Sequence, residues 1–407
     1  MKDPQRVTLE SNPLHRPKQA LDGIRVADFS WVWAGPACTK YLATMGAEVI
    51  RIESRSNVDT ARNTASLFTT LNYNKKSCSI NLKTAEGIRL AKRVVAASDV
   101  MVENFLPGLA ERLGLGYEGL CEVKPDIIMM SSSAMGRGGP LSHYSAYGDI
   151  IFSYAGHAYL TNYPERSPRS LAGYWGDLLT GMTLAFGTLA ALHHRERTGK
   201  GLHIDLSMVE STLSLLPEPL MDYLANHRVA TPRGNEDERG APHGCYPCLG
   251  TDQWIAIAVF TDGEWAALCN VMRRKELLKD SRFSSQGDRW QHRKALDSIV
   301  TEWTRKHSAD ELFHTLQSAG VSAGPSYGIP ELIHDQNLIE RGFFVEVQSA
   351  ELGDHLVTAL PWKLEGQAPR TYRAAPGLGQ DNDYVFQKLL GLTPQEQKAL
   401  EEQEVIY

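Results

Sequence analysis

Short apolar segments alternate with amphipathic ones at the start of the chain. Residues 24–29 form an apolar run typical of a strand, and the spacing after it predicts a helix that begins at Pro36 and ends before Gly46. Residues 48–53 then alternate apolar and charged side chains, which is typical of a second strand. Two strands joined by a helix pair in parallel, so this pattern predicts a βαβ unit.

The same alternation continues to about residue 207. The predicted elements are a helix at 86–97, strands at 99–103 and 126–131, a long helix at 178–197 and a strand at 203–207. The fold class we predict is therefore α/β, with a Rossmann-like, doubly wound parallel sheet in a large domain. No Gly-x-Gly-x-x-Gly follows the first strand, so a dinucleotide is not expected. The long helix is rich in Ala, Gly and Thr, which suits close packing against another helix or a second subunit.

A chain of 407 residues exceeds the ~250–300 residues that one hydrophobic core usually serves, so we expect two domains. The large domain begins with residues 1–225, and polar, turn-forming residues at 226–240 predict a linker. Residues 241–330 predict a smaller α+β domain, and residues 331–407 form a C-terminal segment. The elements predicted in the smaller domain are a strand at 253–259 and helices at 264–272, 293–306 and 309–320.

The charge and cysteine content exclude several classes of protein. A formal net charge of -6 argues against nucleic-acid binding, which usually leaves a basic surface. The six cysteines are dispersed, and Cys245 and Cys248 lack a second ligand pair at zinc spacing, so we interpret them as structural and expect no metal. The first residues lack the apolar stretch of a signal peptide, and no segment approaches ~20 apolar residues. These features predict a cytoplasmic protein without membrane contact.

Several short motifs, taken in order, resemble the class III coenzyme A transferases. This family contains formyl-CoA:oxalate and carnitine-type CoA-transferases and the α-methylacyl-CoA racemases. No single motif is specific, but their order and spacing are. The motifs lie at residues 21–26, 34–36, 46–53, 74–77, 102–105, 176–177, 198–201, 320–325, 341–342 and 375–379.

The resemblance implies an assembly as well as a fold. Members of the family consist of two chains wound through each other like links, each with a Rossmann-like large domain and a small domain. We therefore expect an interlocked dimer in which residues 331–407 return to the large, CoA-binding domain. The partner is either a second copy of the chain or a related subunit. No prosthetic group is implied, because coenzyme A or acyl-CoA is a substrate.

The resemblance also implies a covalent mechanism on Asp177, which matches the family's nucleophile. In that mechanism a carboxylate attacks the acyl-CoA thioester to form a mixed anhydride. The released CoA then forms an aspartyl-CoA thioester, and the acceptor acid reverses these steps. A second interpretation of Asp177 is a helix N-cap, because Gly176 and Asp177 directly precede the predicted long helix. Both roles are compatible, since free amides at a helix start stabilise an anion.

The family pattern places a set of residues around coenzyme A. Cations are needed near its phosphates, and an apolar slot is needed for its adenine and pantetheine. Surface charge or core packing are the alternative roles for these side chains. One cation often used by relatives is absent, because Ser54 stands in its place, and Arg55 is a substitute. The predicted contacts are Val32, Ala34, Ile80, Lys83, Asn104, Phe105, Arg112, Leu113 and Met208.

Aromatic residues are expected to line the binding site of the acceptor carboxylic acid. Trp31 and Trp33 occupy positions where the oxalate enzymes carry His and Gln, and Tyr147 is expected near Asp177. Such a wall suits a bulky or aromatic acid, for example a substituted succinate with succinyl-CoA as donor, better than oxalate. Packing of these rings at a dimer interface is the alternative.

Three other functions are weighed against transfer. A racemase on this fold needs a proton acceptor on each face of the α-carbon, but Gly148 stands where its histidine would be. A non-catalytic subunit of a heteromeric transferase would not need Asp177. A metal hydrolase is disfavoured because no His-Glu-x-x-His or comparable ligand cluster occurs. The sequence therefore predicts a CoA-transferase that acts on an acyl-CoA and a carboxylic acid.

Overall fold

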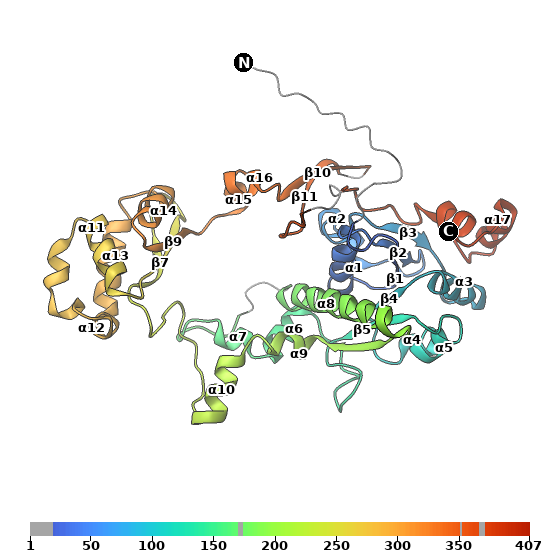
Figure 1. Ribbon diagram of the computed structural model, residues 1–407, viewed down its shortest axis with the longest axis horizontal. Helices are drawn as coiled ribbons and strands as arrows, with labels where there is room; N and C mark the ends of the chain where they lie inside the picture. The colour runs from blue at the N-terminus through green and yellow to red at the C-terminus, as the bar shows by residue number, and fades with distance from the viewer. Residues whose placement is uncertain (1–18, 170–173, 351, 366–370) are drawn as a thin grey trace, which may run out of the picture. The chain divides into compact units, whose positions relative to one another are not determined.

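The computed structural model describes residues 19–169, 174–350, 352–365 and 371–407 (Figure 1). The chain divides into two compact units. The first contains residues 1–157, 170–225 and 342–407, and the second contains residues 158–169 and 226–341. Each unit has its own sheet and its own hydrophobic core.

The first unit, called the large unit below, is built on a six-stranded sheet in its described residues. The strand order is β3-β2-β1-β4-β5-β6, and every neighbouring pair is parallel. This is the order of a doubly wound α/β fold. The predicted α/β class and parallel sheet are confirmed, whereas the interlocked dimer stays a prediction. The strands are β1 (Arg25–Asp28), β2 (Glu48–Glu53), β3 (Lys76–Ser79), β4 (Val100–Glu103), β5 (Ile128–Ser133) and β6 (His203–Ser207).

Helices cover both faces of this sheet because successive strand residues point to opposite sides. Val26 of β1 packs in the core formed with α1 and α8, and Ala27 packs in the core formed with α3. The described helices from β1 to residue 226 are α1 (Ala34–Thr44), η1 (Thr60–Asn63), α2 (Ala65–Asn72), α3 (Ala85–Ala96), α4 (Leu109–Arg112), α5 (Tyr117–Cys121), α6 (Gly148–Tyr154), α7 (His157–Leu160), α8 (Trp175–Thr198), α9 (Met208–Leu213) and α10 (Pro217–Asn226).

Residues near the C-terminus complete the large unit. Asp381 accepts a hydrogen bond from the backbone N–H of Ser77 at 2.9 Å, and Asn382 accepts one from the N–H of Ser79 at 2.9 Å. These contacts cover the edge of the sheet at β3, which would otherwise expose unpaired backbone groups. The elements of this segment are the antiparallel hairpin β10 (Phe344–Ser349) and β11 (Gly353–Thr358), the π-helix η4 (Tyr384–Leu389) and α17 (Pro394–Glu402).

The second unit is a small α+β structure. Its antiparallel three-stranded sheet packs one face against helices through a core that includes Ile255, Ile257 and Leu268. The strands are β7 (His243–Pro247), β8 (Trp254–Ala258) and β9 (Ser322–Pro325), and the helices are α11 (Asp262–Val271), η2 (Lys275–Lys279), η3 (Ser281–Phe283), α12 (Gln286–Gln291), α13 (Arg293–Thr304), α14 (Ala309–Ser318), α15 (Ile329–Ile333) and α16 (Gln336–Glu340).

A fully buried ion pair lies beneath the loop that follows β1. Lys75 Nζ is 3.2 Å from Asp28 Oδ2, and both side chains are inaccessible to solvent. Thr39 donates to the same carboxylate oxygen at 2.6 Å, and Ser30 donates to the other oxygen. Burial alone would raise the pKa of Asp28, but Lys75 and the neighbouring Arg51 lower it below its ordinary value. The aspartate is therefore held as a buried anion.

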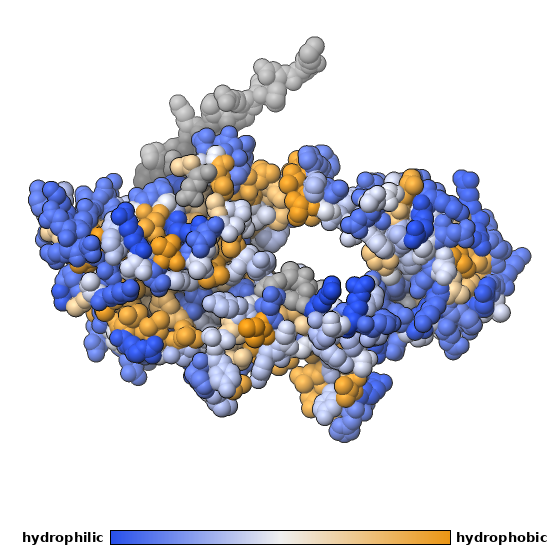
Figure 2. Space-filling view, turned by 180° about the vertical axis from the view of Figure 1, so that it is seen from behind, coloured by the Kyte–Doolittle hydropathy of each residue, from blue (hydrophilic) through white to orange (hydrophobic). Residues whose placement is uncertain are grey.

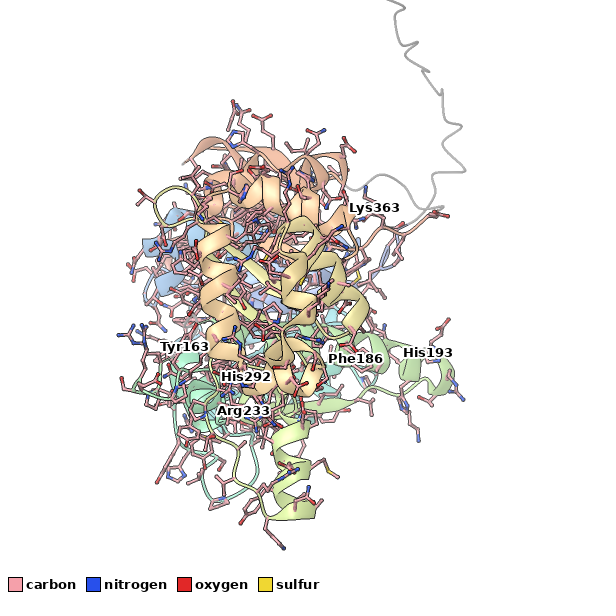
Figure 3. The ribbon with its side chains drawn as sticks, turned by 90° about the vertical axis from the view of Figure 1, so that its left-hand side faces the viewer. Tyr163, Phe186, His193, Arg233, His292 and Lys363 are labelled. Atoms are coloured by element: carbon pink, nitrogen blue, oxygen red, sulfur yellow. The ribbon has the colours of Figure 1, made fainter. Side chains whose placement is uncertain are left out.

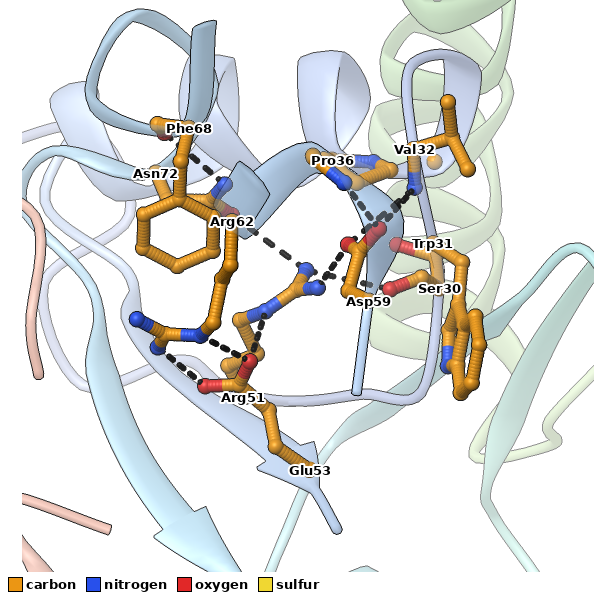
Figure 4. Close-up of polar contacts among 12 residues, drawn as sticks. Ser30, Trp31, Val32, Pro36, Arg51, Glu53, Asp59, Arg62, Phe68 and Asn72 are labelled. Carbon is orange, nitrogen blue, oxygen red and sulfur yellow. Dashed lines mark hydrogen bonds and ion pairs between the residues drawn. The ribbon is translucent and has the colours of Figure 1, made fainter. Parts of the chain in front are cut away.

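A second buried cluster fixes the path of the same loop (Figure 4). The Arg51 guanidinium donates to the Ser30 carbonyl at 3.0 Å and pairs with Asp59, whose carboxylate accepts the Val32 N–H at 3.2 Å. Val32 has a φ of 62°, which a β-branched residue rarely adopts. Such strain persists only where the surroundings enforce it, so Arg51 and Asp59 hold Val32 in place.

We expect Lys75→Met to lower the free energy of unfolding by about 3–5 kcal/mol, because it leaves Asp28 buried beside one cation fewer. Chemical denaturation followed by circular dichroism at fixed protein concentration measures the change. Lys398→Met is the matched control: Lys398 is 76% exposed and should change stability by less than about 0.5 kcal/mol. Equal stability of the two variants would contradict a structural role for the buried pair.

Candidate active site

The carboxyl ends of β1 and β4 lie side by side at the point where the strand order changes direction. Ligands of open α/β sheets bind in the crevice at such a point. Here the two following loops are tied together by one side chain. The Asn104 carboxamide accepts the Trp31 N–H at 2.8 Å and donates to the Trp31 carbonyl at 2.8 Å. This reciprocal pair fixes the floor of the crevice.

A cavity of about 600 Å³ opens above this floor, and we call it the Asp177 cavity. The loops after β1, β4 and β5 supply part of its lining. The starts of four helices supply much of the rest: Trp33 precedes α1, Tyr147 precedes α6, Tyr174 precedes α8, and Met208 begins α9. The N–H groups in a first helical turn have no partner within the helix, so an anion in this cavity meets positive dipole ends.

A second cavity of about 240 Å³ adjoins the first, and we call it the Lys83 cavity. The two share Trp31, Asn57, Phe105 and Leu109 as lining residues. The second cavity combines an apolar surface with hydroxyl groups, one lysine and the carboxylate of Glu53. Its other lining residues include Ser54, Ser56, Ile80, Lys83 and Leu113.

Asp177 lies in the first turn of α8 and lines the first cavity. The N-cap interpretation of this residue is wrong, because α8 begins at Trp175 and its N-cap is Tyr174. Asp177 is the third helical residue, where its own N–H is still free of an intrahelical partner. Burial raises the pKa of Asp177 to about 7, and the nearby Asp149 carboxylate adds to the increase. The side chain is therefore a partly buried carboxylate of unusually high basicity.

Aromatic rings form one wall of the Asp177 cavity. Trp33 and Tyr174 stack with their ring centroids 4.2 Å apart and their planes 21° from parallel. Tyr174 precedes Asp177 by three residues, so both side chains lie on the same face of α8. Trp31 and Tyr147 also line this cavity, as predicted for the acid site, and Tyr147 is 74% exposed.

Most of the residues predicted to contact coenzyme A line one of the two cavities. Val32, Asn104, Phe105 and Met208 line the Asp177 cavity, and Phe105 lines the Lys83 cavity as well. Ile80, Lys83 and Leu113 line only the second.

Ala34 and Arg112 line neither cavity. Ala34 is buried in α1 beneath the first cavity, where it packs in a cluster with Met208 and Ile151. Arg112 is exposed at the last position of α4. Their contacts with coenzyme A stay predictions.

Other lining residues were not singled out from the sequence. Asp149, Tyr174 and Asn57 supply a carboxylate, an aromatic ring and an amide to this group, and Ser132, Ser133 and Ser145 supply hydroxyl groups. The sequence held one indication of the role of Asp149: Gly148 and Asp149 repeat the Gly-Asp pair of residues 176 and 177. No local pattern marks Asn57, which reaches the site from a turn after β2.

Within the described ranges, no group of three or more His, Cys, Asp or Glu side chains is arranged to hold a metal ion. None of the described helices combines the length and apolar content needed to cross a bilayer.

Comparison with known proteins places this site in a family. The model of CoA-transferase family III matches residues 21–382. The succinyl-CoA–D-citramalate CoA-transferase of Chloroflexus aurantiacus is 33% identical over 96% of this chain and 99% of its own length. The β subunit of the succinyl-CoA–L-malate CoA-transferase of the same organism is 30% identical over 95% and 98%.

Solved structures agree with the sequence comparison. A CAIB/BAIF family protein from Brucella suis superimposes with a TM-score of 0.85 at 29% identity, covering 91% of this chain and all of the other. The region that the family model matches, residues 21–382, extends over parts of both units. The chain is therefore a CoA-transferase and belongs to CoA-transferase family III.

Proposed function

We propose that the enzyme transfers coenzyme A from an acyl-CoA to a carboxylic acid through covalent intermediates on Asp177. An Asp177 oxygen attacks the thioester carbonyl, the C–S bond breaks, and a mixed anhydride and CoA thiolate form. The thiolate attacks the aspartyl carbonyl, which releases the donor acid and leaves an aspartyl-CoA thioester. The acceptor carboxylate then repeats the two steps in reverse order.

The observation that carries this proposal is the position of Asp177 in a cavity that adjoins the Lys83 cavity. A thioester of coenzyme A is a long ligand with an anionic nucleotide at one end and the reacting carbonyl at the other. The Lys83 cavity suits the nucleotide, because it combines an apolar slot with a cation, and the carboxylate of Glu53 in its lining is paired with Arg51 and Arg62. Phe105 and Leu109, which line both cavities, mark the path of the pantetheine chain between the two ends.

Charge stabilisation in the proposed mechanism comes from the backbone. Each tetrahedral intermediate places a negative charge on the former carbonyl oxygen, and preorganised N–H donors lower the energy of such a charge. The first turn of α8 presents amides without an intrahelical partner beside Asp177, and α1 begins on the same cavity. The arrangement serves acyl transfer well, and it differs from a racemase site because Gly148 offers no proton acceptor.

We expect Asp177→Asn to fold normally and to lose CoA exchange by at least about a thousandfold, because an amide is not a nucleophile at neutral pH. Exchange of radiolabelled acid between acyl-CoA and free acid measures the loss. Asp354→Asn, an exposed change on β11, is the matched control and should exchange at the wild-type rate. Retained turnover in Asp177→Asn would exclude the covalent role.

The covalent intermediate has its own signature. Incubation with acyl-CoA and hydroxylamine should convert an aspartyl thioester to a hydroxamate on the peptide that contains Asp177. Intact-mass and peptide mass spectrometry detect the product. An active enzyme that never shows this adduct would contradict the mechanism even if Asp177→Asn were inactive.

The acids transferred are inferred from the aromatic wall and from the relatives. Both Chloroflexus relatives are named for succinyl-CoA, so we propose succinyl-CoA as the donor. The acceptor we propose is a bulky or aromatic acid, such as a substituted dicarboxylate. The stacked Trp33 and Tyr174 next to Asp177 offer a flat apolar surface to such an acid.

Trp33→Ala should lower kcat/KM for an aromatic acceptor about tenfold, the effect of losing ~1.4 kcal/mol of contact with one ring. The same variant should transfer CoA to a small aliphatic acid at close to the wild-type rate, which serves as the internal control. Steady-state kinetics with the two acids measure the ratio. An equal loss for both acids would show that Trp33 supports the fold or the CoA site instead of selecting the acceptor.

We also propose that the chain acts as a dimer or as a heteromer with a related subunit. Met182, Phe186 and Leu189 form an exposed apolar stripe on α8, and Phe186 is 73% exposed. Figure 3 shows Phe186 and His193 along this helix. The α10 helix has no buried residue and exposes Leu220, Met221 and Leu224. Figure 2 shows that apolar areas are present on the surface of the molecule. Apolar surface of this kind typically marks a protein interface.

Phe186→Glu should reduce self-association, because a buried, unpaired carboxylate opposes contact through the α8 stripe. Analytical ultracentrifugation over a range of protein concentrations measures the dissociation constant. Gln395→Glu adds the same charge at an exposed position on a different helix, α17, and is the control. If both variants associate as the wild type does, α8 is not part of the interface.

A further inference from the structure

Two Gly-Asp pairs begin the helices that frame the Asp177 cavity. Gly148 and Asp149 are the first two residues of α6, and Gly176 and Asp177 lie in the first turn of α8. Both aspartates line the same cavity. The transfer mechanism described above uses only one of them, so the second carboxylate needs an explanation.

Close packing of the two helix starts brings the carboxylates together. A Cβ atom added to Gly176 would lie 3.3 Å from Ile151 Cγ2 and 3.7 Å from the Gly148 carbonyl oxygen, so α6 and α8 touch through their glycines. The aspartate that follows each glycine enters the shared cavity from its own helix. This placement is a feature of tertiary packing and is not required by either helix alone.

The described residues that line the cavity with Asp177 supply no compensating cation. Tyr147 and Asp149 come from the start of α6, Trp33 from that of α1 and Met208 from that of α9. The lining of this cavity, as far as the structure describes it, contains no Lys, Arg or His. Asp149 is exposed to solvent at the rim, whereas Asp177 is partly buried. Asp149 is therefore the charged neighbour that acts on Asp177.

We propose that Asp149 is a positioning residue for the transfer reaction: its negative charge keeps the Asp177 carboxylate more basic, and hence more nucleophilic, than burial alone would. The inference rests on the proposed covalent role of Asp177. It assigns Asp149 no bond to the substrate.

The chemistry of the first step explains why a more basic Asp177 would favour the transfer. Asp177 donates an electron pair to the acyl carbon while the C–S electrons leave with the CoA thiolate, and no proton is transferred. The rate then depends on the fraction of Asp177 that is ionised and on the basicity of that anion. A nucleophile whose pKa lies near the working pH balances the two requirements. Burial raises the pKa of Asp177 to about 7, and Asp149 contributes to that increase.

The test is the pH dependence of covalent adduct formation with succinyl-CoA in a single turnover, from about pH 5 to about pH 9. The wild-type rate should rise with pH through a midpoint near the Asp177 pKa of about 7. Asp149→Asn should move this midpoint down by about half to one pH unit and lower the plateau rate, because removal of a like charge makes Asp177 easier to ionise and less basic. Asp149→Glu should restore both values.

Two further arms separate a direct charge effect from a structural one. Asp354→Asn removes an equal charge at an exposed site on β11 and should leave the midpoint unchanged. Because Asp149 is exposed, about 1 M salt should screen it and shift the wild-type midpoint towards that of Asp149→Asn, with little effect on the variant.

An unchanged midpoint in Asp149→Asn would overturn the proposal while leaving Asp177 as the nucleophile. Complete loss of the adduct in a folded Asp149→Asn variant would also overturn it, because it would place Asp149 in direct contact with the reacting atoms. If the wild-type enzyme and the Asp354→Asn control turn over without any adduct, the covalent mechanism itself fails.

Discussion

The site depends on buried charges that hold the loop after β1. Asp28 with Lys75 and Arg51 with Asp59 lie under this loop, and the Asp59 carboxylate accepts the N–H of Val32 in its unfavourable left-handed conformation. Buried ions need exact partners, since an unpaired one costs several kcal/mol. The loop therefore has one accessible path. That path brings Trp31 against Asn104 at the switch point and so creates the wall shared by both cavities.

A second constraint, the close packing of α8 against α1, positions Asp177. A Cβ on Gly181 would lie 2.7 Å from Ala37 Cβ and 2.8 Å from the Ala34 carbonyl, so only glycine lets α8 lie this close to α1. The close approach allows Trp33 and Tyr174 to stack across the two helix starts. Asp177, one turn further along α8, is thereby fixed in the cavity. The aromatic wall and the carboxylate are positioned by the same helix contact.

The sequence predicted the elements with strong periodicity and missed those that form through distant contacts. The bounds of β2 and β6 were predicted to the residue. The β3 strand was not predicted, because Lys76–Ser79 has little apolar character. It forms through pairing with β2 and through the hydrogen bond to Asp381. The α8 start was predicted three residues late, since Gly176 disfavours a helix and its contact with α6 is not local. Asp149 and Tyr174 were missed for the same reason: only tertiary packing brings them beside Asp177.

The Asp177 cavity combines two opposing electrostatic effects, and their balance bears on how the proposed mechanism would exchange one acid for another. Helix starts attract the carboxylate of an incoming acid and the oxyanion of each intermediate. Asp177 and Asp149 repel a free carboxylate, most strongly when Asp177 is ionised and uncombined. In the proposed mechanism, Asp177 loses its charge when it carries CoA as a thioester, so an acceptor acid would meet less repulsion. Asp177 would regain its charge when the new acyl-CoA forms. The proposed covalent step would thus change the affinity of the cavity for acids without any movement of the backbone.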